Sequence, residues 1–162
     1  MKVAALDLGS NTFLCLICEL EGLQVTKVYS DEAKVVRLGQ GLSQSKKFHP
    51  EALQRAKEAL IDFKKQIDAQ QPEKILAMAT AAARDAENKH ELFKICEDLS
   101  IPLQIISGEE ESKITYLGSI SGLSDESQRL VIDIGGRSTE FILGKGLNYI
   151  SGHSHNIGCV KL

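Results

Sequence analysis

Two short segments of the chain carry residue types that proteins use to bind phosphate. The first is Asp7-Leu8-Gly9-Ser10-Asn11-Thr12, and the second is Asp133-Ile134-Gly135-Gly136-Arg137-Ser138-Thr139-Glu140. In each, a hydroxyl residue stands five positions after the aspartate, Thr12 in one and Ser138 in the other. Glycine turns let backbone N–H groups approach phosphate oxygens, and hydroxyls add donors. The repeated pattern predicts two loops that face one phosphate chain from opposite sides.

The aspartate in each loop favours a divalent cation. A carboxylate repels phosphate when the two meet directly, but it can hold a cation that also binds the phosphate oxygens. Asp7 is unusual in its apolar strand, because a carboxylate at the end of a buried strand is costly unless something pairs with it. A single Asp-x-Gly turn is more often only a hairpin, so the two matching copies together favour phosphate binding.

Three consecutive glutamates stand at the predicted start of a helix, directly after a Ser-Gly pair. Ser107 and Glu110 form a capping-box pattern, which explains Glu110 structurally. Glu111 has no such explanation, and a carboxylate near two phosphate loops could act as general base for an attacking water. The apolar periodicity leaves both glutamates open, and Glu110 aligns slightly better with Ile114 and Leu117.

Arg84 follows a run of small residues, Ala77-Met78-Ala79-Thr80-Ala81-Ala82-Ala83, at the end of a predicted strand. Small side chains permit a close backbone approach, and an arginine there could bind phosphate through two parallel hydrogen bonds. The alternative, an ordinary exposed arginine on the surface, fits the local sequence equally well.

Apolar patterning predicts the elements that position these residues. Pro50 starts a helix whose apolar residues recur at three- and four-residue spacing. The predicted strands cover residues 2–8, 12–20, 23–29, 74–80, 102–106, 130–134, 139–143 and 147–152, and the predicted helices cover 50–68, 83–99 and 107–118. Residues 31–47 are predicted to be irregular.

The order of these elements predicts an α/β fold, because a strand meander followed by alternating helices and strands builds a mixed sheet flanked by helices. A second meander begins at residue 130 and is not followed by the helices that complete the first. We therefore expect one domain over residues 1–124 and the start of a second, incomplete domain over residues 125–162. Such a half-domain leaves an apolar sheet face uncovered, which favours a fragment of a longer protein or a face that another chain covers.

Composition and charge exclude several classes of protein. The 162 residues are 43% hydrophobic and 25% charged, which is normal for a globular chain with its own core. A net charge of −3 gives no reason to expect binding to nucleic acids or to anionic membranes. No apolar run is long enough to span a bilayer, and the first residues lead directly into a strand without room for a signal peptide. We expect a cytoplasmic protein.

Five motifs resemble, in sequence order, those of the exopolyphosphatase / guanosine pentaphosphate phosphatase family. They are the two phosphate-loop segments and, between them, Arg37-Leu38-Gly39, Ala79-Thr80-Ala81-Ala82-Ala83-Arg84 and Ser107-Gly108-Glu109-Glu110-Glu111. The resemblance covers essentially the whole chain. It implies the fold of the actin-like phosphotransferase superfamily, in which two ribonuclease-H-like domains close on a phosphate chain.

The resemblance also implies roles for individual residues. Glu111, the second glutamate of the family's Ser-Gly-x-Glu-Glu motif, would be catalytic. Asp133 and Glu140 would be the catalytic and metal-binding carboxylates of the second loop, with Asp7 as a further ligand of Mg²⁺ in the first. The phosphate-binding residues would be Gly9, Ser10, Asn11, Thr12, Arg84, Gly135, Gly136, Arg137 and Ser138.

Arg137 departs from the family pattern, which usually has a third glycine at this position. If the position needs a positive φ, an arginine there carries a strain cost. The alternative is that Arg137 supplies an extra positive charge to a polyanionic substrate.

We expect a phosphohydrolase, present as its N-terminal part, that releases terminal phosphate from inorganic polyphosphate or guanosine pentaphosphate with Mg²⁺ as cofactor. One alternative is an actin-like kinase or ATPase, although kinases of this fold often have a basic residue where Phe13-Leu14 stands. Another is a non-catalytic module that binds polyphosphate. The sequence leaves the preferred substrate, the activity of so short a chain and the oligomeric state open, and an uncovered sheet face favours a homodimer.

Overall fold

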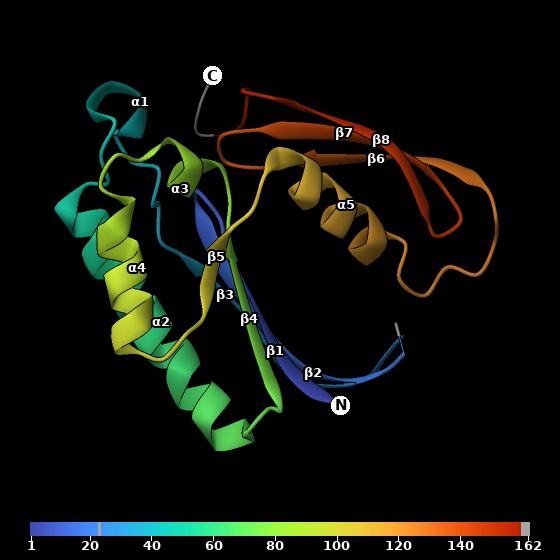
Figure 1. Ribbon diagram of the computed structural model, residues 1–162, viewed down its shortest axis with the longest axis horizontal. Coiled ribbons are helices and arrows are strands. Elements are labelled where there is room, and N and C mark those ends of the chain that lie inside the picture. The colour runs from blue at the N-terminus through green and yellow to red at the C-terminus, as the bar shows by residue number, and fades with distance from the viewer. Residues whose placement is uncertain (23, 160–162) are drawn as a thin grey trace. The chain divides into compact units, whose positions relative to one another are not determined.

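The computed structural model describes residues 1–22 and 24–159 (Figure 1). The chain divides into two compact units, Met1–Ile105 and Ile106–Leu162. The sequence places this division between residues 124 and 125, whereas the structure places it earlier because helix α5 (Gly108–Ser119) packs on the strands that follow it. No helix among the described residues is long and apolar enough to cross a membrane.

The first unit is built on a five-stranded mixed sheet in the order β3-β2-β1-β4-β5. Strands β1 (Lys2–Leu8), β2 (Thr12–Glu21) and β3 (Gln24–Val35) form the predicted antiparallel meander. Strands β4 (Lys74–Ala79) and β5 (Leu103–Ile105) extend the sheet in parallel with β1. The predicted mixed α/β sheet is confirmed, while Leu23, at the start of the predicted third strand, lies outside the described residues.

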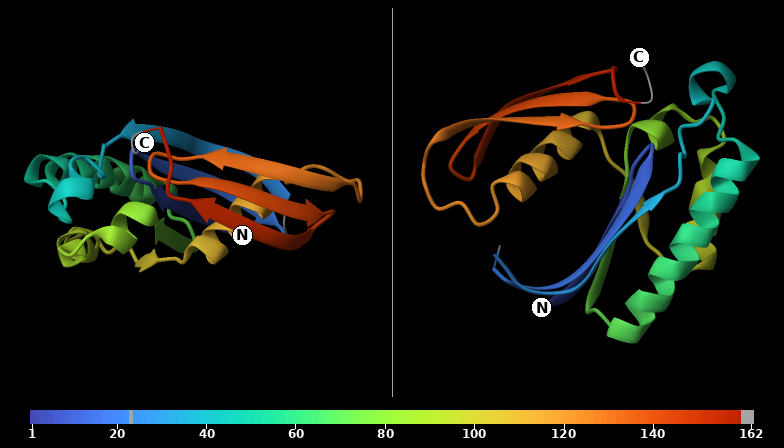
Figure 2. Two further views of the ribbon diagram at one scale, coloured as in Figure 1. Left: turned by 90° about the horizontal axis from the view of Figure 1, so that it is seen from above. Right: turned by 180° about the vertical axis from the view of Figure 1, so that it is seen from behind.

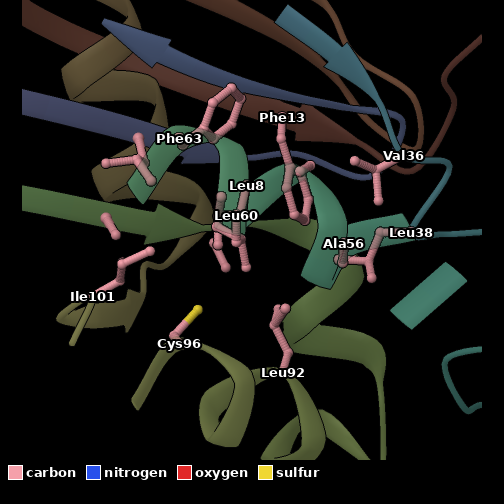
Figure 3. Close-up of a cluster of buried hydrophobic side chains, with 14 of the residues drawn as sticks. Leu8, Phe13, Val36, Leu38, Ala56, Leu60, Phe63, Leu92, Cys96 and Ile101 are labelled. Atoms are coloured by element: carbon pink, nitrogen blue, oxygen red, sulfur yellow. The ribbon is translucent and has the colours of Figure 1, made fainter. Parts of the chain in front are cut away.

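Helices α2 (Pro50–Gln70) and α4 (Lys89–Asp98) cover one face of this sheet (Figure 2). Helix α2 begins where the sequence predicts, because Pro50 takes its first position and the His49 side chain accepts a hydrogen bond from the Glu51 N–H. The apolar sides of both helices meet the sheet in one core. Figure 3 labels ten of its residues: Leu8, Phe13, Val36, Leu38, Ala56, Leu60, Phe63, Leu92, Cys96 and Ile101.

Two segments of the first unit differ from the predicted elements. Strand β3 continues through residues 31–35, and the short helix α1 (Leu42–Ser45) follows, where the sequence predicts an irregular segment over 31–47. As an edge strand that is mostly exposed, β3 does not need an apolar pattern. The helix predicted over 83–99 is two helices, α3 (Ala81–Asp85) and α4. They are separated at Asn88, whose side chain accepts from the Phe48 N–H at 2.7 Å.

The second unit is a three-stranded antiparallel sheet of β6 (Gln128–Ile134), β7 (Thr139–Lys145) and β8 (Asn148–His155), with helix α5 on one face. A small apolar cluster of Tyr116, Ile120 and Ile142 joins the helix to the sheet. Leu130 and Ile132 lie on the opposite face and are 60% and 51% exposed. The described residues of this unit therefore present exposed apolar side chains on that face, as the sequence predicts.

Helix α5 turns a different face to the sheet from the one that its apolar residues suggest. Ile114 and Leu117 are exposed, whereas Tyr116 is fully buried. Gly144 of β7 explains this, because a Cβ added there would lie closer than 3.0 Å to the Tyr116 ring. The Tyr116 hydroxyl also donates to the Gly146 carbonyl at 2.8 Å. The face of α5 that packs on the sheet is therefore set by the space above Gly144, which the Tyr116 ring fills. The positions of Ile114 and Leu117 do not set it.

Candidate active site

In the first unit the predicted phosphate-binding residues gather at one edge of the sheet. Residues 9–11 turn from β1 into β2, and Leu8 pairs with Ala79, so the carboxyl ends of β1 and β4 are neighbours. Helix α3 starts directly after β4 and carries the half-buried Arg84. The structure therefore places Arg84 at the same sheet edge as Gly9, Ser10, Asn11 and Thr12.

The Arg37-Leu38-Gly39 segment supports this turn through its backbone. The N–H groups of Val36 and Arg37 donate to the Asn11 carbonyl at 2.9 and 2.8 Å, and the Gly39 N–H donates to the Ser10 carbonyl at 2.8 Å. Arg37 adopts a positive φ of 54°, which is uncommon outside glycine. The shaped loop predicted here therefore acts on the phosphate loop by hydrogen bonding to its carbonyls.

Asp7 is exposed, contrary to the expectation that its strand is buried on both faces. Strand alternation puts the buried Leu6 and Leu8 on the face that packs in the core, and Asp7 on the other. The carboxylate thereby avoids the desolvation cost that made it unusual in the sequence.

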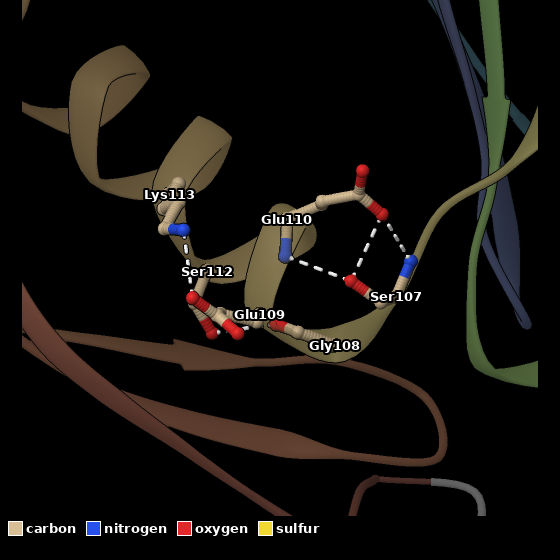
Figure 4. A network of polar contacts seen from close by, with 6 residues as sticks. All are labelled: Ser107, Gly108, Glu109, Glu110, Ser112 and Lys113. Atoms are coloured by element: carbon tan, nitrogen blue, oxygen red, sulfur yellow. Dashed lines mark hydrogen bonds and ion pairs between the residues drawn. The ribbon is translucent and has the colours of Figure 1, made fainter.

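In the second unit, helix α5 begins with the predicted capping box (Figure 4). The Ser107 hydroxyl accepts from the Glu110 N–H at 3.2 Å, and the Glu110 carboxylate accepts from the Ser107 N–H at 2.8 Å. These hydrogen bonds with Ser107 lower the pKa of Glu110. Glu109 forms an ion pair with Lys113 at 2.7 Å. Two of the three glutamates therefore interact with residues of their own helix and its cap, and Glu111, the glutamate that the family resemblance predicts to be catalytic, is half-buried.

Asp133 and Glu140 are directly opposite each other on β6 and β7. Glu140 is only 1% exposed, and Asp133 is half-buried. Burial, followed by the charge of Glu140, raises the pKa of Asp133 above its ordinary value. Two carboxylates on opposed strand positions repel each other when both are ionised, and a divalent cation bound between them would relieve that repulsion.

The oxygen chemistry of this carboxylate pair fits Mg²⁺. Within residues 1–22 and 24–159, no group of three or more His, Cys, Asp or Glu side chains could hold a metal ion. Mg²⁺ is usually bound through one or two protein carboxylates, with waters and substrate phosphates completing its shell. Asp133 and Glu140 can supply those two carboxylates, while Asp7, the third predicted ligand, belongs to the first unit.

The turn between β6 and β7 contains Gly135, Gly136, Arg137 and Ser138. It is closed by the Gly135 N–H, which donates to the Ser138 carbonyl at 2.9 Å. Arg137 and Ser138 are each 5% exposed. Arg137 is not among the described residues with a positive φ, so the arginine does not carry the strain cost that its replacement of a glycine suggests.

Two residues near this hairpin carry no signal in the sequence. The Ser154 hydroxyl of β8 donates to Oε1 of Glu140 at 2.7 Å. Gly158 lies so close to the turn that an added Cβ would be 2.6 Å from the Arg137 nitrogen and from the Gly135 carbonyl oxygen. Only the pairing of β8 with β7 and the path of the chain after β8 bring these two residues to the site.

Comparisons with known proteins agree with the fold. A family model described as the Ppx/GppA phosphatase family matches residues 16–162. Exopolyphosphatase 2 of Mycobacterium tuberculosis is 34% identical over 171 residues, an alignment that covers 99% of this chain and 53% of the relative. The crystal structure of an exopolyphosphatase-like protein has a TM-score of 0.92 at 31% identity and covers 99% of this chain and 52% of that chain. The chain thus spans about half the length of the curated relatives it matches.

A more distant likeness shows the fold alone. MreB5 of Spiroplasma citri has a TM-score of 0.51 at 17% identity, covering 97% of this chain and 52% of that protein. The fold is therefore the actin-like one that the motif order implied. The family match over residues 16–162, together with the mixed sheet and the two loops, leads to one conclusion: the chain belongs to the Ppx/GppA phosphatase family.

Proposed function

We propose that this protein is a phosphohydrolase that releases terminal phosphate from inorganic polyphosphate, from guanosine pentaphosphate, or from both. The observation that carries the proposal is the buried Glu140 opposite Asp133, on a hairpin whose turn contains two glycines and a serine hydroxyl. The family match and the identity to an exopolyphosphatase support the same class of reaction.

In the proposed reaction, the backbone of residues 135–138 and the Ser138 hydroxyl bind phosphate oxygens. Residues 9–12 and Arg84 are the proposed phosphate donors of the first unit. Glu111 orients the attacking water and accepts its proton. The water oxygen bonds to the terminal phosphorus as the bond to the bridging oxygen breaks. Asp133 and Glu140 would hold Mg²⁺, which when bound neutralises charge on the phosphate oxygens.

Phosphate release from long-chain polyphosphate in the presence of Mg²⁺ tests this proposal on wild type, Glu111→Gln and Glu109→Gln. Glu109→Gln is a matched control because it neutralises the neighbouring carboxylate, which is exposed and paired with Lys113. We expect Glu111→Gln to slow release at least ~100-fold, the lower end for loss of a general base. Polyphosphate binding should persist in both variants. Loss of binding together with release in Glu111→Gln would contradict the assigned role.

The same assay on a longer version of the protein distinguishes the remaining hypotheses about function. Release from the longer chain alone would mean that further residues complete the site. Polyphosphate binding without release from either chain would support a binding module, and thermal stabilisation by ATP would support an actin-like kinase or ATPase. A homodimer remains a prediction, which light scattering after size-exclusion chromatography checks.

A further inference from the structure

Glu140 is the one carboxylate in the described part of the chain that is buried. A buried carboxyl group without hydrogen-bond partners is costly, so the groups around it must supply hydrogen bonds. The element that supplies a donor is β8, which pairs with β7. The hydrogen bond to Glu140 therefore comes from β8, which lies outside both phosphate-loop motifs.

Ser154 supplies this donor from the position directly opposite Glu140. The sheet register places Asp133, Glu140 and Ser154 in one row across β6, β7 and β8. The Ser154 hydroxyl donates to Oε1 at 2.7 Å, a normal distance for an O–H···O hydrogen bond. Because the hydrogen bond uses Oε1, the Oε2 atom stays available for a ligand.

Ser154 also lies beside the start of helix α5. A Cβ built on Gly108, the first residue of the helix, would lie 3.8 Å from the Ser154 Cβ, which is ordinary van der Waals contact. Glu111 follows three residues later on the same helical turn. One serine therefore binds Glu140 and lies beside the helical turn that carries the proposed general base.

We propose that Ser154 is a positioning residue, whose hydroxyl holds the Glu140 carboxylate in one rotamer with Oε2 directed to the cation and phosphate. This inference rests on the proposed function, because it assumes that Glu140 binds Mg²⁺. Outer hydrogen-bond partners of metal ligands typically change metal affinity 10- to 100-fold when they are removed.

The first experiment needs no metal and no substrate. Side-chain rotamer populations and the carboxyl ¹³C shift of Glu140 are measured by NMR in wild type, Ser154→Ala, Ser154→Thr and Ser151→Ala. Ser151 is the matched control, because it lies on the same strand and is opposite Leu143 rather than Glu140. We expect Ser154→Ala alone to average the rotamers and shift the carboxyl resonance, while threonine, which keeps the hydroxyl, preserves both. An unchanged rotamer and shift in Ser154→Ala would overturn the proposal.

The second experiment measures Mn²⁺ affinity of the same proteins by calorimetry, with Mn²⁺ standing in for Mg²⁺. We expect Ser154→Ala to weaken binding about 10- to 100-fold, and Ser154→Thr and Ser151→Ala to stay within about threefold of wild type. Equal affinity in wild type and Ser154→Ala would overturn the positioning role. Failure of wild type to bind Mn²⁺ would instead contradict the metal site of the proposed function, and the rotamer measurement would still decide whether Ser154 holds Glu140.

Discussion

Replacing Gly144 by alanine should loosen helix α5 from the sheet, because the Tyr116 ring occupies the space that a Cβ needs. The added atom would lie closer than 3.0 Å to three atoms of the tyrosine, Cζ, Cε2 and Oη. Tyr116 is fully buried, so its ring has no open space into which to swing. The strain must therefore be relieved by moving the helix, which carries Glu111.

The expected cost has two parts. Overpacking a filled core typically costs about 1–3 kcal/mol. Displacing the ring also breaks the 2.8 Å hydrogen bond from the Tyr116 hydroxyl to the Gly146 carbonyl, and a buried hydrogen bond contributes about 1 kcal/mol. We therefore expect Gly144→Ala to lower the free energy of unfolding of the second unit by about 2–4 kcal/mol.

Hydrogen exchange of the α5 backbone amides measures this locally, since it reports opening of the second unit separately from the first. Gly118→Ala is the matched control: it lies in α5, and a Cβ there would meet nothing within 4 Å. Because alanine favours the helix over glycine, Gly118→Ala should raise protection by about 0.5–1 kcal/mol. The two glycine substitutions should thus change the hydrogen-exchange protection of α5 in opposite directions.

The reasoning is refuted if Gly144→Ala leaves the protection of α5 within about 0.5 kcal/mol of wild type, the usual range for a surface change. A double-mutant cycle adds a second check. In a Tyr116→Ala background the clash is gone, so Gly144→Ala should cost less than about 1 kcal/mol there. An equal cost in both backgrounds would show that the destabilisation by Gly144→Ala does not come from contact with Tyr116.

Three further changes have defined outcomes. Ser107→Ala removes the cap of α5 and should cost about 1 kcal/mol in hydrogen exchange of its first turn. Asn88→Ala removes the hydrogen bond to the Phe48 N–H and should lower the free energy of unfolding of the first unit by about 1–3 kcal/mol in urea, since that amide loses its partner. Folding raises the pKa of Asp133, so its charge opposes folding at pH values above the raised pKa and has no effect well below 3.8. Asp133→Asn should therefore stabilise the chain at pH 7 more than at pH 3, and a larger gain at pH 3 would contradict this sign.

Local chemistry in the sequence predicted the start of α5 correctly. The capping box of Ser107 and Glu110 depends on residues three positions apart, and the structure has both of its hydrogen bonds. The helix start at Pro50 and the two hairpins are confirmed for the same reason. Each of these features is determined by neighbours in the chain.

Features that depend on distant partners were not predictable in this way. The buried face of α5 depends on the empty space above Gly144, so the apolar Ile114 and Leu117 suggested the wrong face. Nothing in the sequence distinguishes Ser154 from the other serines, and only the pairing of β8 with β7 brings it beside Glu140. The resemblance to the exopolyphosphatase / guanosine pentaphosphate phosphatase family, by contrast, needed only the motifs and their order, and the family match confirms it.

The irregularity in β8 has a consequence for which side chain meets Glu140. Gly144 pairs with Tyr149, but Leu143 pairs with Ser151, so Ile150 is an extra residue in the ladder. If Ile150 were paired with Leu143 in a regular ladder, antiparallel counting would bring His153, rather than Ser154, opposite Glu140. A hydroxyl would then be exchanged for an imidazole without any change in amino-acid composition. A one-residue deletion at Ile150 would instead make the ladder regular and keep Ser154 opposite Glu140, because Ser151 would still pair with Leu143. The extra residue thus decides, from four positions away along the chain, which side chain meets the carboxylate.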